Sequence, residues 1–230
     1  MKEEKISAGS HDLNKWLLGG YERDIITVFY GGPGTGKTNL CLLAAVSQAK
    51  KGNKVIFVDT EGGFSVERVK QISGENYEKV LKNILLLKPT DFSEQKKVFD
   101  KLYKNLKKEA SLIIVDGMAI LYRLDLALAR ENGEDKMREI NSELVRQMKI
   151  LAEIARKRNI PILVTNQVYK WEDGQRMVGG DILRYWAKCL IELENKEGSR
   201  RIYLRKHRSI KEKNMGFQIT NDGVKKRGWL

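Results

Sequence analysis

Short runs of apolar, often β-branched residues alternate with amphipathic segments along most of this 230-residue chain. Unbroken apolar runs predict strands that are buried on both faces, and apolar residues spaced three and four apart predict helices with one buried face. The predicted strands are residues 25–30, 54–58, 84–87, 111–115 and 160–164, and the predicted helices are residues 39–51, 65–72, 77–82, 93–108 and 136–158, with a further short helix within 6–24. This alternation is typical of an α/β fold with a mostly parallel central sheet flanked by helices.

The C-terminal part of the chain has a different pattern. Residues 189–194, 200–206 and 215–220 are strand-like, and the residues between them include the turn-forming triplets Glu197–Ser199 and Asn221–Gly223. Strands separated by such turns predict C-terminal antiparallel hairpins.

No repeat or low-complexity linker divides the chain, so residues 1–230 are predicted to form a single domain, with residues 1–10 as a short N-terminal tail. The segment 122–135 is charged and is predicted to be a loop.

A glycine-rich segment joins the strand at 25–30 to the helix at 39–51. It consists of Gly31, Gly32, Pro33, Gly34, Thr35, Gly36, Lys37 and Thr38, and Asn39 follows it. The segment fits the pattern G-x-x-x-x-G-K-[ST] in the strand-loop-helix context that makes the pattern specific for nucleotide phosphates. Its glycines allow successive backbone N–H groups to face one point at a helix N-terminus, where an anion is favoured. Lys37 is predicted to reach the β- and γ-phosphates and the Thr38 hydroxyl to bind Mg²⁺, so ATP and Mg²⁺ are the predicted cofactors.

Acidic side chains follow two other predicted strands. Asp116 comes directly after the apolar run 111–115, and Glu61 lies just beyond the run 54–58. Because the carboxyl ends of parallel strands meet at one edge of a sheet, both acids are expected beside the phosphates. Asp116 is predicted to bind Mg²⁺ together with Thr38, and Glu61 to be the general base that activates water. The alternatives are an aspartate that only caps a strand and a glutamate that is solvated in a loop.

The net charge of +13 is distributed unevenly. Residues 200–228 hold ten Lys or Arg residues and only two acidic ones. This concentration predicts a polyanionic partner, nucleic acid before membrane, because no amphipathic helix with a broad apolar stripe accompanies it. A lysine-rich surface of the thermophile type accounts for the general excess of charge but not for its clustering.

Nothing in the chain predicts membrane insertion or export. No apolar run approaches the roughly 18 residues needed to span a bilayer, and the first residues lack a signal-peptide pattern. Cys41 and Cys189 lie in apolar surroundings and are predicted to be buried thiols, without a disulfide or zinc site. The predicted location is the cytoplasm.

Several motifs together resemble the RecA-type recombinase core, and most closely its archaeal and eukaryotic branch. The motifs are Asp59-Thr60-Glu61-Gly62-Gly63-Phe64 with Glu67-Arg68, then Leu112-Ile113-Ile114-Val115-Asp116-Gly117 with Leu121-Tyr122-Arg123, then Leu163-Val164-Thr165-Asn166-Gln167. The resemblance implies a RecA-type P-loop ATPase core from about residue 9 onward. It also implies that Glu61 activates water, that Arg68 stacks on adenine, and that Gln167 senses the γ-phosphate.

Within that family the chain is similar to the RadB group, short archaeal paralogues of the recombinase RadA. Few residues precede the core, so no separate N-terminal DNA-binding domain is expected, and no Phe-x-x-Ala polymerisation segment lies upstream. The second DNA-binding loop of the family is abbreviated here to residues 168–177. These departures imply that filament growth and strand exchange are reduced or absent.

Two short segments are candidate DNA-binding sites. Lys170, Trp171 and Arg176 place an aromatic ring between cations, a combination that holds single strands by stacking and phosphate contact. The alternative for Trp171, given equal weight, is that its ring only covers the base of the loop and does not stack on DNA. The cluster Lys206, His207 and Arg208 is predicted to bind DNA, with a neighbouring subunit's nucleotide site or a solvated hairpin turn as alternatives.

The sequence therefore predicts an ATP- and Mg²⁺-binding accessory protein of homologous recombination and DNA repair with weak ATPase activity. The predicted partners are single- and double-stranded DNA and a RadA-type recombinase, and other recombination or replication proteins are further candidates. Two alternatives remain open, namely a self-sufficient strand-exchange recombinase and a KaiC-like signalling ATPase that does not bind DNA.

Overall fold

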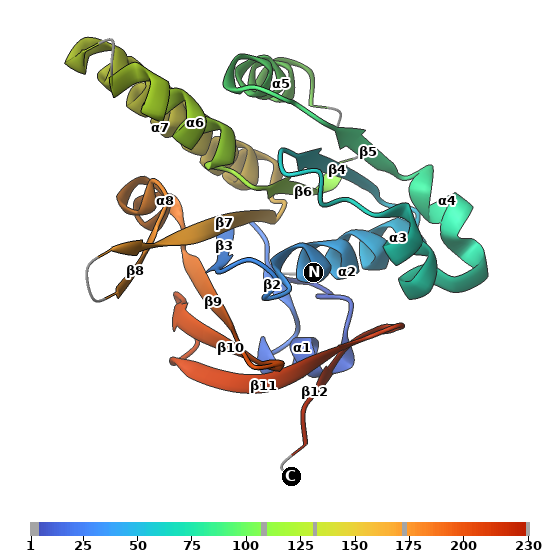
Figure 1. The fold of residues 1–230 in the computed structure, drawn as a ribbon. Coiled ribbons are helices and arrows are strands. Elements are labelled where there is room, and N and C mark those ends of the chain that lie inside the picture. Colours follow the sequence, from blue (N-terminus) through green and yellow to red (C-terminus); the bar gives the residue numbers. More distant parts are fainter. Residues whose placement is uncertain (1–4, 107–109, 131–132, 172–173, 229–230) are drawn as a thin grey trace.

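A long twisted sheet with helices on both faces forms the centre of the molecule (Figure 1). The computed structural model describes residues 5–106, 110–130, 133–171 and 174–228. Its parallel part consists of β3 (Ile26–Gly31), β4 (Lys54–Asp59), β5 (Ile84–Leu87), β6 (Ala110–Asp116) and β7 (Ile162–Trp171), in the spatial order β3-β7-β6-β4-β5. The predicted α/β architecture is confirmed.

The apolar runs form strands because side chains on both faces of the sheet are buried. In β6, Leu112 and Ile114 belong to one apolar core, whereas Ile113 and Val115 belong to the other. The helices that cover the first core are α1 (His11–Trp16), α2 (Lys37–Lys50), α3 (Val66–Ser73) and α4 (Tyr77–Leu81), with the short 3-10 helix η1 (Gly74–Asn76) between the last two. Those that cover the second are α5 (Phe92–Asn105), α6 (Ile120–Ala129), α7 (Glu134–Arg158) and α8 (Gly180–Trp186).

The C-terminal strands continue the same sheet in antiparallel fashion. They are β9 (Cys189–Lys196), β10 (Ser199–Lys206), β11 (Lys213–Thr220) and β12 (Gly223–Lys226). β9 also pairs in parallel with β3, so it joins the antiparallel extension to the parallel centre. The predicted C-terminal hairpins are therefore confirmed. A separate two-stranded sheet, β1 (Lys5–Ile6) with β2 (Tyr21–Glu22), lies near the N-terminus.

Two segments differ from the sequence prediction. Most of the predicted loop 122–135 is the helix α6, which forms because Leu121, Tyr122 and Ala129 are buried on one face. The Tyr122 hydroxyl donates a hydrogen bond to Asn141 Oδ1 on α7 at 2.6 Å, which fixes the two helices together. Of the charged residues in this helix, Arg123 is exposed, whereas Asp125 lies on the same side as the buried residues and is half-buried.

The segment after Gln167 is a β-hairpin and not a loop. β7 continues to Trp171 and pairs with β8 (Gly174–Met177), with Val168 opposite Met177 and Tyr169 opposite Arg176. Figure 1 shows this hairpin extending away from the remainder of the sheet. The pairing with the end of β7 therefore fixes the register of β8 within the abbreviated segment.

The predicted burial of both cysteines is confirmed. Cys41 and Cys189 are both buried free thiols, and burial raises the pKa of Cys189 to about 12. No helix within the described ranges is both long and apolar enough to cross a bilayer.

Gly31 ends β3 at a point where no side chain would fit. Its register partners are Gln167 on β7 and Leu193 on β9. A Cβ atom at this position would lie 2.1 Å from the Leu193 carbonyl oxygen, far inside van der Waals contact. Glycine therefore allows β9 to approach the strand that carries the phosphate loop.

We expect Gly31→Ala to lower the free energy of unfolding by at least about 2 kcal/mol, because backbone atoms must move apart to admit the methyl group. Urea titration followed by circular dichroism measures the change. The control is Gly32→Ala, where an added Cβ has no heavy atom within 4 Å. Equal stability of the two variants would contradict this account of the β3–β9 contact.

Candidate functional site

The glycine-rich segment wraps around the N-terminus of α2. Gly36 precedes the helix with φ of 109°, and Gly34 has φ of 70°, both in the left-handed region that favours glycine. The Thr35 hydroxyl donates to the Gly32 carbonyl at 2.9 Å, which closes the turn. The predicted strand-loop-helix geometry of a phosphate-binding loop is present.

Lys37 is buried with its ammonium group against the loop. Its Nζ donates to the carbonyl oxygens of Gly31 and Gly32, each at 2.9 Å. Burial lowers the pKa of Lys37, and the charges of Glu61 and Asp116 offset part of that change. The cation is therefore held inside the loop with two acids nearby.

Asp116 ends β6 and is almost completely buried, with 1% of its surface exposed. Its Oδ2 accepts a hydrogen bond from the Thr38 hydroxyl at 2.8 Å, and its Oδ1 accepts one from the Thr165 hydroxyl at 2.6 Å. Burial raises the pKa of Asp116, while the two hydroxyl donors favour the charged form and oppose the rise. The two predicted Mg²⁺ ligands, Thr38 and Asp116, are thus in direct contact.

Gly63 approaches this pair without a side chain. A Cβ at Gly63 would lie 3.2 Å from Asp116 Oδ2 and 3.4 Å from Thr38 Oγ1. Asp59, the register partner of Asp116, holds this segment by accepting from the backbone N–H groups of Gly63 and Phe64, each at 3.0 Å. The pair consists of one hydroxyl and one carboxylate, which suits Mg²⁺, an ion that usually takes few protein ligands and keeps waters or phosphates.

Glu61 and Gln167 meet above the strand ends. Gln167 Nε2 donates to Glu61 Oε2 at 2.9 Å, although the residues are far apart in the sequence. Gly117 makes room for this contact, since a Cβ there would lie 2.5 Å from Glu61 Cγ. The predicted general base and the predicted phosphate sensor are therefore hydrogen-bonded to each other.

Arg68 lies on α3 beside the first turn of α2. Its Nε donates to Asn39 Oδ1 at 2.7 Å, and its two terminal nitrogens donate to the carbonyls of Asn221 and Gly223 at 3.0 and 3.2 Å. The guanidinium edge is thus fixed by the helix on one side and by the β11–β12 turn on the other. A fixed edge leaves the planar group in a defined orientation, as stacking on a base requires.

The DNA-binding candidates of the hairpin lie on β7 and β8. Arg176 is exposed on β8. The backbone of Lys170 and Trp171 belongs to β7, whereas their side chains lie outside the described residues. All three therefore share one two-stranded element.

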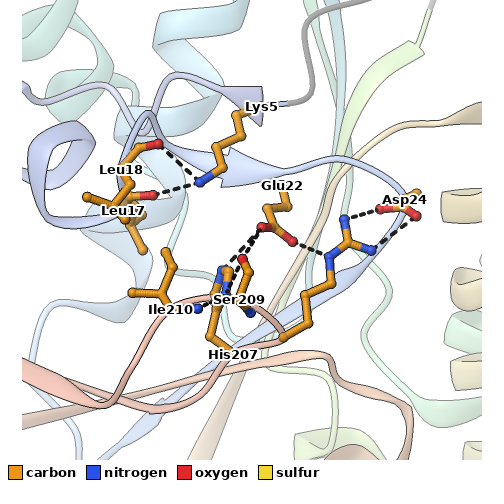
Figure 2. A network of polar contacts seen from close by, with 9 residues as sticks. Lys5, Leu17, Leu18, Glu22, Asp24, His207, Ser209 and Ile210 are labelled. Carbon is orange, nitrogen blue, oxygen red and sulfur yellow. Dashed lines mark hydrogen bonds and ion pairs between the residues drawn. The ribbon is translucent and has the colours of Figure 1, made fainter.

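The second DNA-binding candidate, residues 206–208, is engaged within the chain, and Figure 2 shows His207 of this segment facing Glu22. Arg208 forms an ion pair with Glu22 through Nε, and its NH2 lies 2.9 Å from Asp24 Oδ1. Lys206 Nζ donates to the carbonyls of Arg184 and Ala187 at 3.0 and 2.8 Å. These contacts join the β10–β11 connection to the N-terminal segment and to the end of α8.

His207 is the buried member of the same cluster, with 3% of its side chain exposed. Its Nδ1 accepts hydrogen bonds from the backbone N–H groups of Ser209 and Ile210 at 3.1 and 3.2 Å. Burial lowers the pKa of His207, and the nearby Glu22 opposes that effect. The ring therefore organises the turn, and this geometry does not favour direct contact with DNA.

Sequence reasoning missed the supporting residues of the site. Thr165 and Asp59 were noted only as parts of motifs, yet Thr165 holds both Asp116 and, through its oxygen, the backbone N–H of Gly117 at 2.7 Å. A polar residue directly after an apolar strand was the available signal in both cases. Arg200 of β10 gives no such signal, because in the sequence it is one of many cations in a basic region.

Comparisons with known proteins give a consistent result. The family described as Rad51 matches residues 2–227. The DNA repair and recombination protein RadB of Methanococcus maripaludis strain C7 is 41% identical over 213 residues, covering 92% of this chain and 96% of that protein. The protein of the same name from Methanocaldococcus jannaschii is 40% identical over 212 residues, covering 92% and 98%. A solved structure described as the crystal structure of the RadB recombinase superimposes with a TM-score of 0.80 at 35% identity, covering 95% of this chain and 98% of the other.

Because Asp116 is buried, its charged form is expected to lower the stability of the folded protein. A carboxyl group with a raised folded-state pKa stabilises the fold fully only below its unfolded pKa, about 4, and this stabilisation is lost as pH rises through the folded value. We therefore expect Asp116→Asn to raise the Tm at pH 8 and to raise it less, or not at all, near pH 4.

Differential scanning calorimetry at the two pH values measures this difference. Asp222→Asn is the control, because the hydrogen bond from Thr220 lowers the pKa of that exposed acid and predicts no gain at pH 8. A lower Tm for Asp116→Asn at pH 8 would contradict the prediction.

Proposed function

The chain belongs to the Rad51 family, and from that premise we propose that it is a DNA repair and recombination protein that binds ATP, Mg²⁺ and DNA. The observation that carries the nucleotide part is the contact between Thr38 of the phosphate loop and the buried Asp116 of β6. The sequence motifs predict a role for each of these two residues separately. The contact between them supports a single Mg²⁺ site formed by both.

Each part of the proposed site has a distinct task. The backbone N–H groups of the loop and Lys37 bind the phosphates, and Arg68 stacks on the base. Thr38 and Asp116 hold Mg²⁺, which when bound supplies positive charge against the developing negative charge of the phosphates. Glu61 orients and deprotonates water. The side-chain amide of Gln167 donates hydrogen bonds to Glu61 and to the terminal phosphate.

We further propose an accessory role beside a RadA-type recombinase, with slow ATP hydrolysis. The short β7–β8 hairpin in place of a longer DNA-binding loop supports this role over independent strand exchange. A self-sufficient recombinase would form filaments on single-stranded DNA with ATP, which electron microscopy detects. The proposed location of such a protein is the cytoplasm.

Nucleotide binding and turnover should separate by residue. We expect Lys37→Ala to lose most ATP affinity, whereas Glu61→Gln keeps affinity and hydrolyses ATP on the order of a hundredfold more slowly, as for loss of a general base. Calorimetric titration and phosphate release measure the two quantities. Glu67→Gln, a neighbouring exposed acid that pairs with Lys70, is the control and should behave as the wild type. A matching loss of affinity in Glu61→Gln would remove Glu61 from the catalytic role.

DNA binding should depend on the β7–β8 hairpin more than on residues 206–208. We expect Trp171→Ala to cost about 1–3 kcal/mol on single strands with an unchanged salt slope, since stacking releases no counterions. Arg176→Ala should flatten the slope of log K against log salt by about one.

The variant with both Lys206→Ala and Arg208→Ala is the informative comparison. Because both side chains bond within the chain, we expect a lower Tm and an unchanged salt slope. Fluorescence anisotropy across a salt series measures all three variants. If the slope of log K against log salt is instead flattened by about two in the double variant, residues 206–208 bind DNA.

A further inference from the structure

One arginine of β10 lies on the face of the strand that is otherwise apolar. Ile202 and Leu204 point into the core with 1% of each side chain exposed, and Arg200 has the same parity, so it lies on the same face. Its register partner on β11 is Phe217, whose ring is within 3.7 Å of the Cβ position of Gly36. The first residues of β10 therefore lie directly beside the phosphate loop.

The polar groups of Arg200 face that loop and are incompletely bonded. One terminal nitrogen approaches the Gly34 carbonyl oxygen at 3.4 Å, near the outer limit of a hydrogen bond. The Nε atom is fully buried and donates to no partner, and no ion pair of Arg200 occurs within the described ranges. A buried donor without an acceptor is unfavourable, because it has lost its hydrogen bonds to water.

The other arginines of the strand are bonded differently. Arg201 donates to Asn214 Oδ1 at 3.1 Å, and Arg205 forms an ion pair with Glu192 at 2.6 Å, both on the outer face. Among the arginines of β10, the buried Nε without a partner is thus specific to Arg200; elsewhere in the described residues Arg23 Nε shares this property.

We propose that Arg200 is a phosphate-binding residue of the nucleotide site, acting from β10 of the same chain. This inference rests on the proposed nucleotide binding. Lys37 provides the parallel, because its ammonium group likewise rests on loop carbonyl oxygens. Phosphate oxygens are stronger acceptors than carbonyls for a charged donor, and the planar guanidinium fork matches their geometry.

The position of Arg200 has a consequence for assembly. A cation that neutralises phosphate charge from the same chain does not depend on a neighbouring subunit. The phosphate site of this protein would then be complete in a single copy, so nucleotide affinity should not depend on protein concentration.

The test compares two arginines on opposite faces of one strand. Arg200→Gln should weaken Mg·ATP binding roughly tenfold or more, the scale expected for a charge-assisted hydrogen bond, and should weaken inorganic triphosphate binding by a similar factor. Arg201→Gln should bind both as the wild type does. Isothermal titration calorimetry measures both ligands, and thermal unfolding verifies that each variant is folded. Arg200→Lys, which keeps the charge but not the fork, should fall between the wild type and Arg200→Gln.

A second readout uses the wild-type protein. In ¹⁵N-arginine-labelled protein, the Nε–H resonance that is lost in Arg200→Lys should shift on addition of ATP and not on addition of adenosine. An unshifted resonance, or unchanged affinity in Arg200→Gln while Lys37→Ala loses binding, overturns the inference and leaves the proposed function in place. Failure of the wild type to bind ATP overturns both.

Discussion

The in-register alignment of parallel strands is the constraint on which the site depends. Gly31 of β3 lies opposite Gln167 of β7, and Asp59 of β4 lies opposite Asp116 of β6. β6 and β7 are held in register one step earlier, at Val115 and Val164. Because β3, β4 and β6 end at the level that β7 passes at Gln167, the phosphate loop, the buried aspartate and the amide meet at one edge of the parallel sheet. A shift of one residue in any strand would turn the relevant side chain to the opposite face.

Burial makes this edge both useful and costly. Asp116 is held as a nearly inaccessible carboxylate by the hydroxyls of Thr38 and Thr165, and Lys37 is held as a buried ammonium group. Each charge is expensive to remove from water, and each is retained because hydrogen bonds and opposite charges compensate. A preorganised, poorly solvated arrangement of this kind interacts more strongly with a phosphate than the same groups would in water.

The parts that sequence predicts are those specified by local pattern. The strands, the long helices and the phosphate loop follow from apolar periodicity and from a motif whose mechanism requires its residues. The helix α6 was missed because its buried positions, Leu121, Tyr122 and Ala129, are interspersed with charges, and only packing against α7 identifies the buried face. The cluster at 206–208 was interpreted from its charge alone, because nothing in the local sequence indicates that Glu22 and Asp24 would lie against it.

The C-terminal antiparallel strands act as a wall of the site and as its link to the N-terminus. At one end, Phe217 and Ile219 lie against Gly36, and the β11–β12 turn holds Arg68. At the other end, Arg208 and His207 lie against Glu22. Since these strands pair with β9, and β9 pairs with the strand that carries the phosphate loop, both ends are connected through backbone hydrogen bonds to the same element. The basic region predicted from composition is therefore partly structural: Arg208 pairs with the acids Glu22 and Asp24, and Arg200 lies against the Gly34 carbonyl of the glycine-rich loop.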